Sequence, residues 1–191
     1  MLAGHLREKG VDVVATREPG GTSLGRNLRA AFLETEETVS PRAELLLFAA
    51  DRAQHVEFLV RPSIAAGKVV ISDRYADATT AYQGAGRGFD AAYVEQVIAI
   101  ATGGLKPDMT VFFDIPVERA IERMKVRPDS HTVQNRMDSE SWEFYERVRD
   151  AYMKIAAAEP NRFRIINGDR SVEEVQADAV ALVDEFLAQN V

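Results

Sequence analysis

The sequence contains no cysteine and no long hydrophobic run. Without cysteine, the chain can form no disulfide and no thiolate metal site, and this composition favours a reducing compartment. No apolar stretch approaches the roughly 20 residues that a membrane-spanning helix needs, and no signal peptide is visible, so we expect a cytoplasmic protein without a membrane partner. The three histidines, His5, His55 and His131, are far apart in the chain. We therefore predict no histidine metal site and place each histidine on the surface.

The sequence also has fewer basic than acidic residues. The chain has 23 Lys and Arg against 30 Asp and Glu, a net charge of −7. Because proteins that bind nucleic acid are usually basic, we expect no nucleic-acid partner. A length of 191 residues with 46% apolar residues suits one domain with a sizeable core. The chain is therefore expected to form a single domain over residues 1–191.

Helical patterns alternate with short buried strands along the whole chain. The run Val69-Val70-Ile71 is β-branched and shows no polar alternation, which is typical of a strand covered on both faces. Strands are predicted at 11–15, 69–72, 109–113 and 163–166, and helices at 1–9, 22–33, 41–60, 76–82, 90–102, from 116 onward, from 138 or 139 to 158, and from 171 onward. This alternation predicts an α/β fold with a mostly parallel sheet flanked by helices.

Charged residues follow two of these strands directly. Arg17-Glu18 comes after the first strand and precedes Pro-Gly-Gly-Thr, and Asp73-Arg74 ends the second. Ligands of open α/β sheets bind outside the carboxyl ends of the strands. An Asp there can hold Mg²⁺, and an adjacent Arg can bind a phosphate through two N–H groups. The alternative for each pair is an ordinary ion pair at a strand end.

The helix over 41–60 carries a second candidate group. Phe48 and Arg52 are four residues apart and share one helical face, where a ring can stack on a planar base and a guanidinium can bind its carbonyl edge. In the alternative interpretation, Phe48 belongs to the core and Arg52 extends from it to solvent. Arg29, in the preceding helix, can face the same site or the solvent.

Two segments have no apolar periodicity. The glycine-rich stretch 83–88 suggests a mobile loop. Residues 128–135 are polar and lie between the basic residues Arg123, Lys125, Arg127 and Arg136. This second segment is either a solvated loop or a lid, over about 127–137, that brings cations onto a polyphosphate.

Taken together, several motifs resemble bacterial thymidylate kinase over essentially the whole chain. They are REPGGT at 17–22, LLLFAADR at 45–52, SDRY at 72–75, TTAYQG at 79–84 and the basic segment. The resemblance implies a P-loop-NTPase-like fold of the nucleoside monophosphate kinase type. It also implies transfer of the γ-phosphoryl group of ATP to dTMP, giving dTDP for dTTP biosynthesis, with Mg²⁺ as cofactor and a homodimer as the assembly.

The resemblance also implies a role for each matching residue. Phe48 stacks on thymine and Arg52 bonds its carbonyl edge, while Thr79 and Gln83 neighbour the base and sugar. Arg29 and Arg74 clamp the dTMP phosphate. Asp73 and Glu18 are the acids around Mg²⁺ and the acceptor. The catalytic cations are Arg123, Lys125 and Arg127, which stabilise charge in the transition state.

The sequence departs from the family in one respect. It contains no G-x-x-x-x-G-K-[ST] segment, and Gly67-Lys68 stands elsewhere. The resemblance then implies an N-terminally truncated domain without the ATP phosphate loop and without the first central strand, which would lie between the strands at 69–72 and 109–113. We expect such a chain to be inactive by itself. The alternatives are a non-catalytic dTMP-binding remnant and a kinase for another nucleoside monophosphate.

Overall fold

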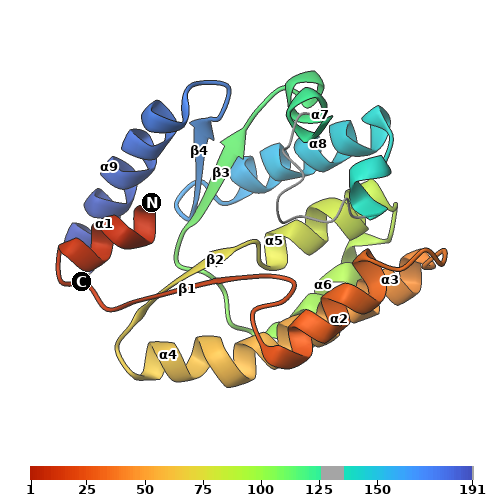
Figure 1. Cartoon of the computed structure of the whole chain (residues 1–191), viewed down its shortest axis with the longest axis horizontal. Coiled ribbons are helices and arrows are strands. Elements are labelled where there is room, and N and C mark those ends of the chain that lie inside the picture. Colours follow the sequence, from red (N-terminus) through yellow and green to blue (C-terminus); the bar gives the residue numbers. More distant parts are fainter. Residues whose placement is uncertain (126–135, 191) are drawn as a thin grey trace.

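The computed structural model describes residues 1–125 and 136–190 (Figure 1). In chain order the elements are α1 (Leu2–Glu8), β1 (Val13–Arg17), α2 (Ser23–Leu33), α3 (Pro41–His55), η1 (Val56–Val60), α4 (Arg61–Ala65), β2 (Val69–Asp73), α5 (Ala76–Thr79), η2 (Thr80–Gly86), α6 (Ala91–Thr102), β3 (Thr110–Asp114), α7 (Val117–Lys125), η3 (Arg136–Ser139), α8 (Trp142–Ala158), β4 (Phe163–Asn167) and α9 (Val172–Asn190). None of the helices in these ranges is long and apolar enough to cross a membrane.

The strands form two parallel pairs. β1 pairs with β2 from Val13–Val69 to Arg17–Asp73, and β3 pairs with β4 from Thr110–Phe163 to Asp114–Asn167. No ladder joins β2 to β3 within the described residues, and the two pairs run in different directions in Figure 1. The predicted α/β class with parallel strands is confirmed. The strands at 69–72 and 109–113, between which the resemblance implied a missing strand, are not paired with each other in the described structure.

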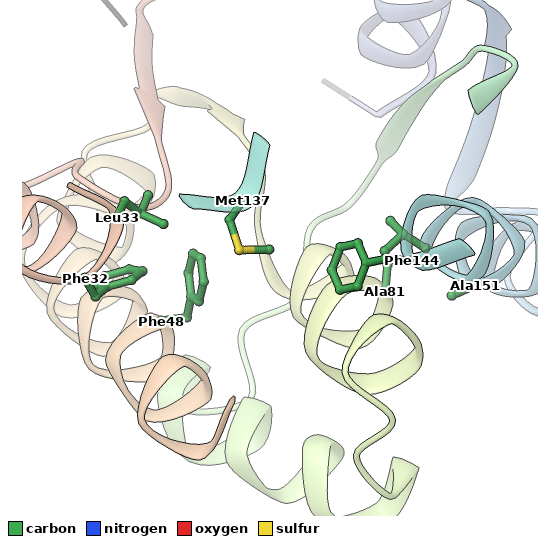
Figure 2. Packing of buried hydrophobic residues seen from close by; sticks show 8 residues of the cluster. Phe32, Leu33, Phe48, Ala81, Met137, Phe144 and Ala151 are labelled. Carbon is green, nitrogen blue, oxygen red and sulfur yellow. The ribbon is translucent and has the colours of Figure 1, made fainter. Parts of the chain in front are cut away.

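Two hydrophobic clusters hold the helices against the strands and against one another. The larger joins α2, α3, η2, η3 and α8, and the smaller packs α1 on β1 and α9. In Figure 2 the Met137 side chain of η3 reaches between the rings of Phe48 and Phe144. Burying each large apolar side chain stabilises the fold by about 1.5–3 kcal/mol. The larger cluster therefore connects α3, which carries Phe48 and Arg52, to η2, which carries Gln83.

Side chains cap the starts of several helices. The Ser40 hydroxyl accepts from the Ala43 N–H at 3.2 Å, and the Asp90 carboxylate accepts from the Tyr93 N–H at 3.1 Å. Ser171 forms a reciprocal capping box with Glu174. Helix α8 begins later than the predicted 138 or 139, because Ser141 caps it ahead of Trp142.

Two local predictions are wrong. The helix over 41–60 does not stop at Arg61-Pro62, because the π-helical turn η1 leads into α4 with Pro62 in its first turn, where a missing N–H is tolerated. Likewise, most of the glycine-rich stretch is no mobile loop, since residues up to Gly86 form the π-helix η2. A Cβ on Gly86 would lie 2.6 Å from the Phe144 ring. This glycine therefore lets η2 pack closely on α8.

Candidate active site

The carboxyl ends of β1 and β2 bring two of the predicted acids together. Arg17 is in register with Asp73, and the Glu18 N–H donates to the Asp73 carbonyl oxygen at 2.9 Å. A hollow of ≈ 430 Å³ opens at this edge and is lined by Ala15, Thr16, Arg17, Gly20, Gly21 and Asp73. A larger hollow of ≈ 680 Å³ borders β4 and α9, and none of the predicted site residues lines it. The β1–β2 edge is therefore where the chemistry-bearing side chains gather.

Arg52 connects this edge to α3 and α5. Its side chain is 2% exposed. Nε donates to Oε2 of Glu18 at 2.8 Å, Nη1 to the Thr79 hydroxyl at 2.7 Å, and Nη2 to the Tyr75 carbonyl oxygen at 3.1 Å. A buried guanidinium requires such partners, above all the carboxylate. The three bonds fix both the position and the plane of Arg52.

His55 completes the network, and its predicted place on the surface is wrong. The ring is 0% exposed, its Nδ1 lies 2.7 Å from Oε1 of Glu18, and its Nε2 lies 2.8 Å from the Thr16 hydroxyl. Because a carboxylate can only accept, Nδ1 is the donor. Both oxygens of Glu18 are thus engaged by residues of α3. His5 is partly exposed and pairs with Asp184, and His131 lies outside the described residues.

The spacing along α3 contains the signal that would have identified His55. Glu44, Phe48, Asp51, Arg52 and His55 are all buried and follow one another at intervals of four, three, one and three residues. These intervals place all five on one face of a helix. Sequence reasoning found only Phe48 and Arg52, because it treated the three charged or polar neighbours separately from the helical face.

Asp51 was also missed. Its Oδ1 accepts from the Gly20 N–H at 3.0 Å, and burial raises the pKa of its carboxyl group. Within the described part of the chain, its Oδ2 has no hydrogen-bond partner. A Cβ on Gly25 would lie 2.3 Å from Oδ1, so this glycine allows α2 to approach α3. Asp51 therefore ties the REPGGT loop to α3.

The two arginines predicted to clamp a phosphate lie near the same loop. Arg29 Nη1 donates to the Pro19 carbonyl oxygen at 3.4 Å. Burial lowers the pKa of Arg29, and the positive charges of Arg17 and Arg74 lower it further. Arg74 has a φ of 71° and holds its guanidinium 4.2 Å from the centre of the Tyr82 ring. Several positive groups thus lie close enough to repel one another, an arrangement that an anion would stabilise.

Phe48 lies in the hydrophobic core, as one of its two sequence interpretations expects. It is 6% exposed and packs edge to face against Phe32 with ring centres 4.9 Å apart. Nε2 of Gln83 donates at 2.8 Å to Glu44, which lies one helical turn before Phe48 on α3. The Thr79 hydroxyl accepts from Arg52, which lies one turn after Phe48. The predicted base and sugar neighbours therefore contact the residues one turn before and one turn after Phe48.

The predicted catalytic cations lie elsewhere. Arg123 donates to the Gly168 carbonyl oxygen at 3.0 Å and to Asp169 at 3.3 Å, at the carboxyl end of β4. Lys125 is exposed at the end of α7. Arg127 and most of the predicted lid over 127–137 lie outside the described residues, and Met137, at its end, is buried in the larger hydrophobic cluster.

The chain is similar to known proteins over most of its length. The family model for thymidylate kinase matches residues 1–179. A thymidylate kinase from Desulfovibrio desulfuricans is 45% identical over 190 residues, covering 97% of this chain and 88% of the relative, and one from Clavibacter michiganensis is 46% identical over 178 residues, covering 93% and 82%. The solved structure of thymidylate kinase from Ehrlichia chaffeensis has a TM-score of 0.75 at 33% identity, covering 96% and 88% of the two chains. The chain belongs to the thymidylate kinase family.

Proposed function

We propose that the protein is a dTMP kinase that transfers the γ-phosphoryl group of ATP to dTMP. The observation that carries this proposal is the face of α3, which presents a buried ring and a buried guanidinium beside the acids and arginines at the β1–β2 edge. One end of this arrangement suits a base and the other suits a phosphate. A nucleoside monophosphate has both groups.

In this proposal, Phe48 and Arg52 recognise the thymine base. Base–aromatic stacking is worth about 1–3 kcal/mol per base. Arg52 has five N–H groups, of which Glu18, Thr79 and Tyr75 engage three. The remaining N–H groups can donate to a base carbonyl, and Glu18 holds the guanidinium in place for that contact.

Arg29 and Arg74 hold the phosphate of dTMP, and Asp73 lies beside the acceptor oxygen. Burial and the positive charges of Arg17 and Arg74 lower the pKa of Arg29, and a bound phosphate dianion would offset the repulsive part of this effect. The strained backbone of Arg74 supports this assignment, because residues in sparsely populated conformations concentrate at functional sites. The exposed Asp73 carboxylate is free of the Glu18–Arg52–His55 network and can contact the reacting groups.

The donor set at this edge fits Mg²⁺ held jointly with substrate phosphates. Within the described ranges, no three potential ligands converge as an all-protein metal site. Mg²⁺ is commonly bound through one or two carboxylates plus phosphate oxygens and water, so Asp73 suffices from the protein side. Such an ion would neutralise charge on the transferred phosphoryl group. Glu18, with both oxygens engaged by Arg52 and His55, would support the site from behind Arg52.

The test is ATP-dependent formation of dTDP from dTMP, measured through the ADP that is released, in a coupled assay. Asp73→Asn should reduce turnover by at least about 10²-fold, on the scale of removing one group that acts on transition-state charge, while leaving dTMP binding intact. dTMP binding without any turnover would favour the alternative of a non-catalytic dTMP-binding protein. That alternative is supported by the absence of a G-x-x-x-x-G-K-[ST] segment from the 191 residues. Failure to bind dTMP would contradict both.

We also propose that the protein forms a homodimer. Phe58, Ile64 and Ile100 are large apolar side chains with exposed fractions of 70%, 47% and 82%. Arg61, at the start of α4, donates to the carbonyl oxygens of Thr102 and Gly103, so α4 meets the end of α6 near these side chains. Burial in a dimer would remove this apolar surface from water. Light scattering should give twice the 21.1 kDa chain mass, and a monomer would contradict the proposal.

A further inference from the structure

Glu44 is a buried carboxylate to which the proposed function assigns no role. It is 0% exposed, and its Oε1 accepts from Nε2 of Gln83 at 2.8 Å. Arg87 donates to both of its oxygens, from Nε at 3.1 Å and from Nη2 at 2.9 Å. Burying an ion pair in place of apolar residues rarely adds stability. The buried pair of Glu44 and Arg87 is therefore expected to have a role other than stabilising the fold.

The contacts of Glu44 determine which way the Gln83 amide points. Arg87 is always charged and donates to both carboxylate oxygens, so these oxygens act as acceptors. Only the NH₂ end of Gln83 can then face Glu44. The carbonyl oxygen of the amide is consequently directed away from Glu44 and is presented as an acceptor.

This amide lies beside the proposed base site. Glu44 and Phe48 are four residues apart on α3 and share its buried face. Arg87 Nη2 also reaches the Met137 sulfur at 3.5 Å, and Met137 packs in the same cluster as Phe48. Figure 2 shows the Met137 side chain next to the Phe48 ring. A base stacked on Phe48 would thus have Gln83 within reach at its edge.

We propose that Glu44 is a positioning residue that sets base specificity by holding the Gln83 carbonyl oxygen toward the base. This inference rests on the proposed function. Thymine and uracil carry an N3–H donor on the edge that pairs with other bases, whereas N3 of cytosine is an acceptor. An amide oxygen fixed by Glu44 accepts from the donor and repels the acceptor. The site therefore takes dTMP and dUMP and rejects dCMP.

The test is Glu44→Gln, with dissociation constants for dTMP, dUMP and dCMP measured by calorimetry. In the new residue an NH₂ group replaces one of the two oxygens, so Gln83 and both donors of Arg87 can no longer all be accepted. When this NH₂ group takes the place of Oε1, Gln83 turns over and presents its own NH₂ group to the base, so the direction of the Gln83 amide is no longer fixed. The ratio of dTMP affinity to dCMP affinity should fall by about tenfold or more, corresponding to about 1.4 kcal/mol per factor of ten. dUMP should follow dTMP.

Glu140→Gln is the matched control. Glu140 is the other carboxylate that accepts from Arg87, at 2.6 Å, and it has no hydrogen bond with Gln83 in the described structure. The same chemical change there should leave the affinity ratio unchanged. A merely structural role for Glu44 would weaken dTMP and dCMP binding alike, so an unchanged ratio in a folded Glu44→Gln protein overturns the proposal.

A second variant decides the matter if Glu44→Gln does not fold. Gln83→Leu removes the amide and leaves Glu44 paired with Arg87, so it should also lower the ratio. An unchanged ratio of dTMP affinity to dCMP affinity would show that neither Gln83 nor Glu44 contributes to base selection. A wild-type protein that binds no dTMP would instead refute the proposed function itself. Wild-type discrimination that persists in these variants refutes the roles of Glu44 and Gln83 in base selection and leaves the proposed function standing.

Discussion

The buried pair of Glu18 and Arg52 can be tested by a double-mutant cycle. Arg52→Met removes the guanidinium but leaves the Glu18 carboxylate, with its side chain 2% exposed, without the donor that now lies 2.8 Å from Oε2. Breaking a buried ion pair from one side destabilises a protein by about 3–5 kcal/mol. For a domain of this size, that shift corresponds to about 6–20 °C in Tm.

The double variant Glu18→Gln with Arg52→Met should be more stable than Arg52→Met alone. Neutralising both partners removes the unpaired charge, so the remaining cost is the loss of the bond between residues 52 and 18 and of the bonds of Arg52 to Thr79 and Tyr75, the last two at about 1 kcal/mol each. We therefore expect a coupling free energy of about 2 kcal/mol or more, in the range for residues of one network.

Urea denaturation of the four proteins, followed by circular dichroism, gives this coupling energy. The control is the same pair of substitutions at Arg119 and Glu122, whose side chains are 54% and 62% exposed although they lie 2.8 Å apart. An exposed pair of this kind should couple by less than about 0.5 kcal/mol. If the effects of the Glu18 and Arg52 substitutions on the free energy of unfolding were additive to within about 0.5 kcal/mol, the buried network would not hold Arg52 as we infer.

Two further predictions concern packing at the site. In a version of the protein that also carries a G-x-x-x-x-G-K-[ST] phosphate loop, Phe48→Ala should raise the Michaelis constant for dTMP by about five- to a hundredfold and leave that for ATP unchanged, because one stacked ring contributes about 1–3 kcal/mol. In the same background Phe163→Ala, which removes a ring that is 3% exposed in β4, should alter stability alone. If both variants changed the Michaelis constant for dTMP equally, Phe48 would have a purely structural role. Gly86→Ala should destabilise the fold by about 1–3 kcal/mol, because the new methyl group would lie 2.6 Å from the Phe144 ring. A Tm that is unchanged in differential scanning calorimetry would contradict that contact.

Local sequence signals predicted the elements well where short-range chemistry decides them. The strand at 69–72 and the helices over 90–102 and from 171 onward each depend on a local pattern, and the structure contains all three within one or two residues of the predicted positions. The π-helical turns η1 and η2 were not predictable in the same way. They depend on packing between elements far apart in sequence, such as η2 on α8 through Gly86 and Phe144.

For the candidate site, the sequence could identify residue types but not their pairing. The rule that ligands bind at strand carboxyl ends predicted that residues 17–18 and 73–74 would lie at one edge, and the structure pairs Arg17 with Asp73 and joins the Glu18 and Asp73 backbones there. The burial of His55 and Glu44 depends on partners 37 and 39 residues away, Glu18 and Gln83. No local pattern shows such partners, although the common helical face of α3 was visible in the spacing.

The most direct test of the account is a crystal structure of the protein with dTMP. We predict the thymine ring stacked on Phe48 at about 3.5–4 Å, in van der Waals contact, with the phosphate between Arg29 and Arg74. Arg52 should keep its bond to Glu18 while it donates to the base. A dTMP molecule bound away from α3, or one whose phosphate touches neither arginine, would contradict the account.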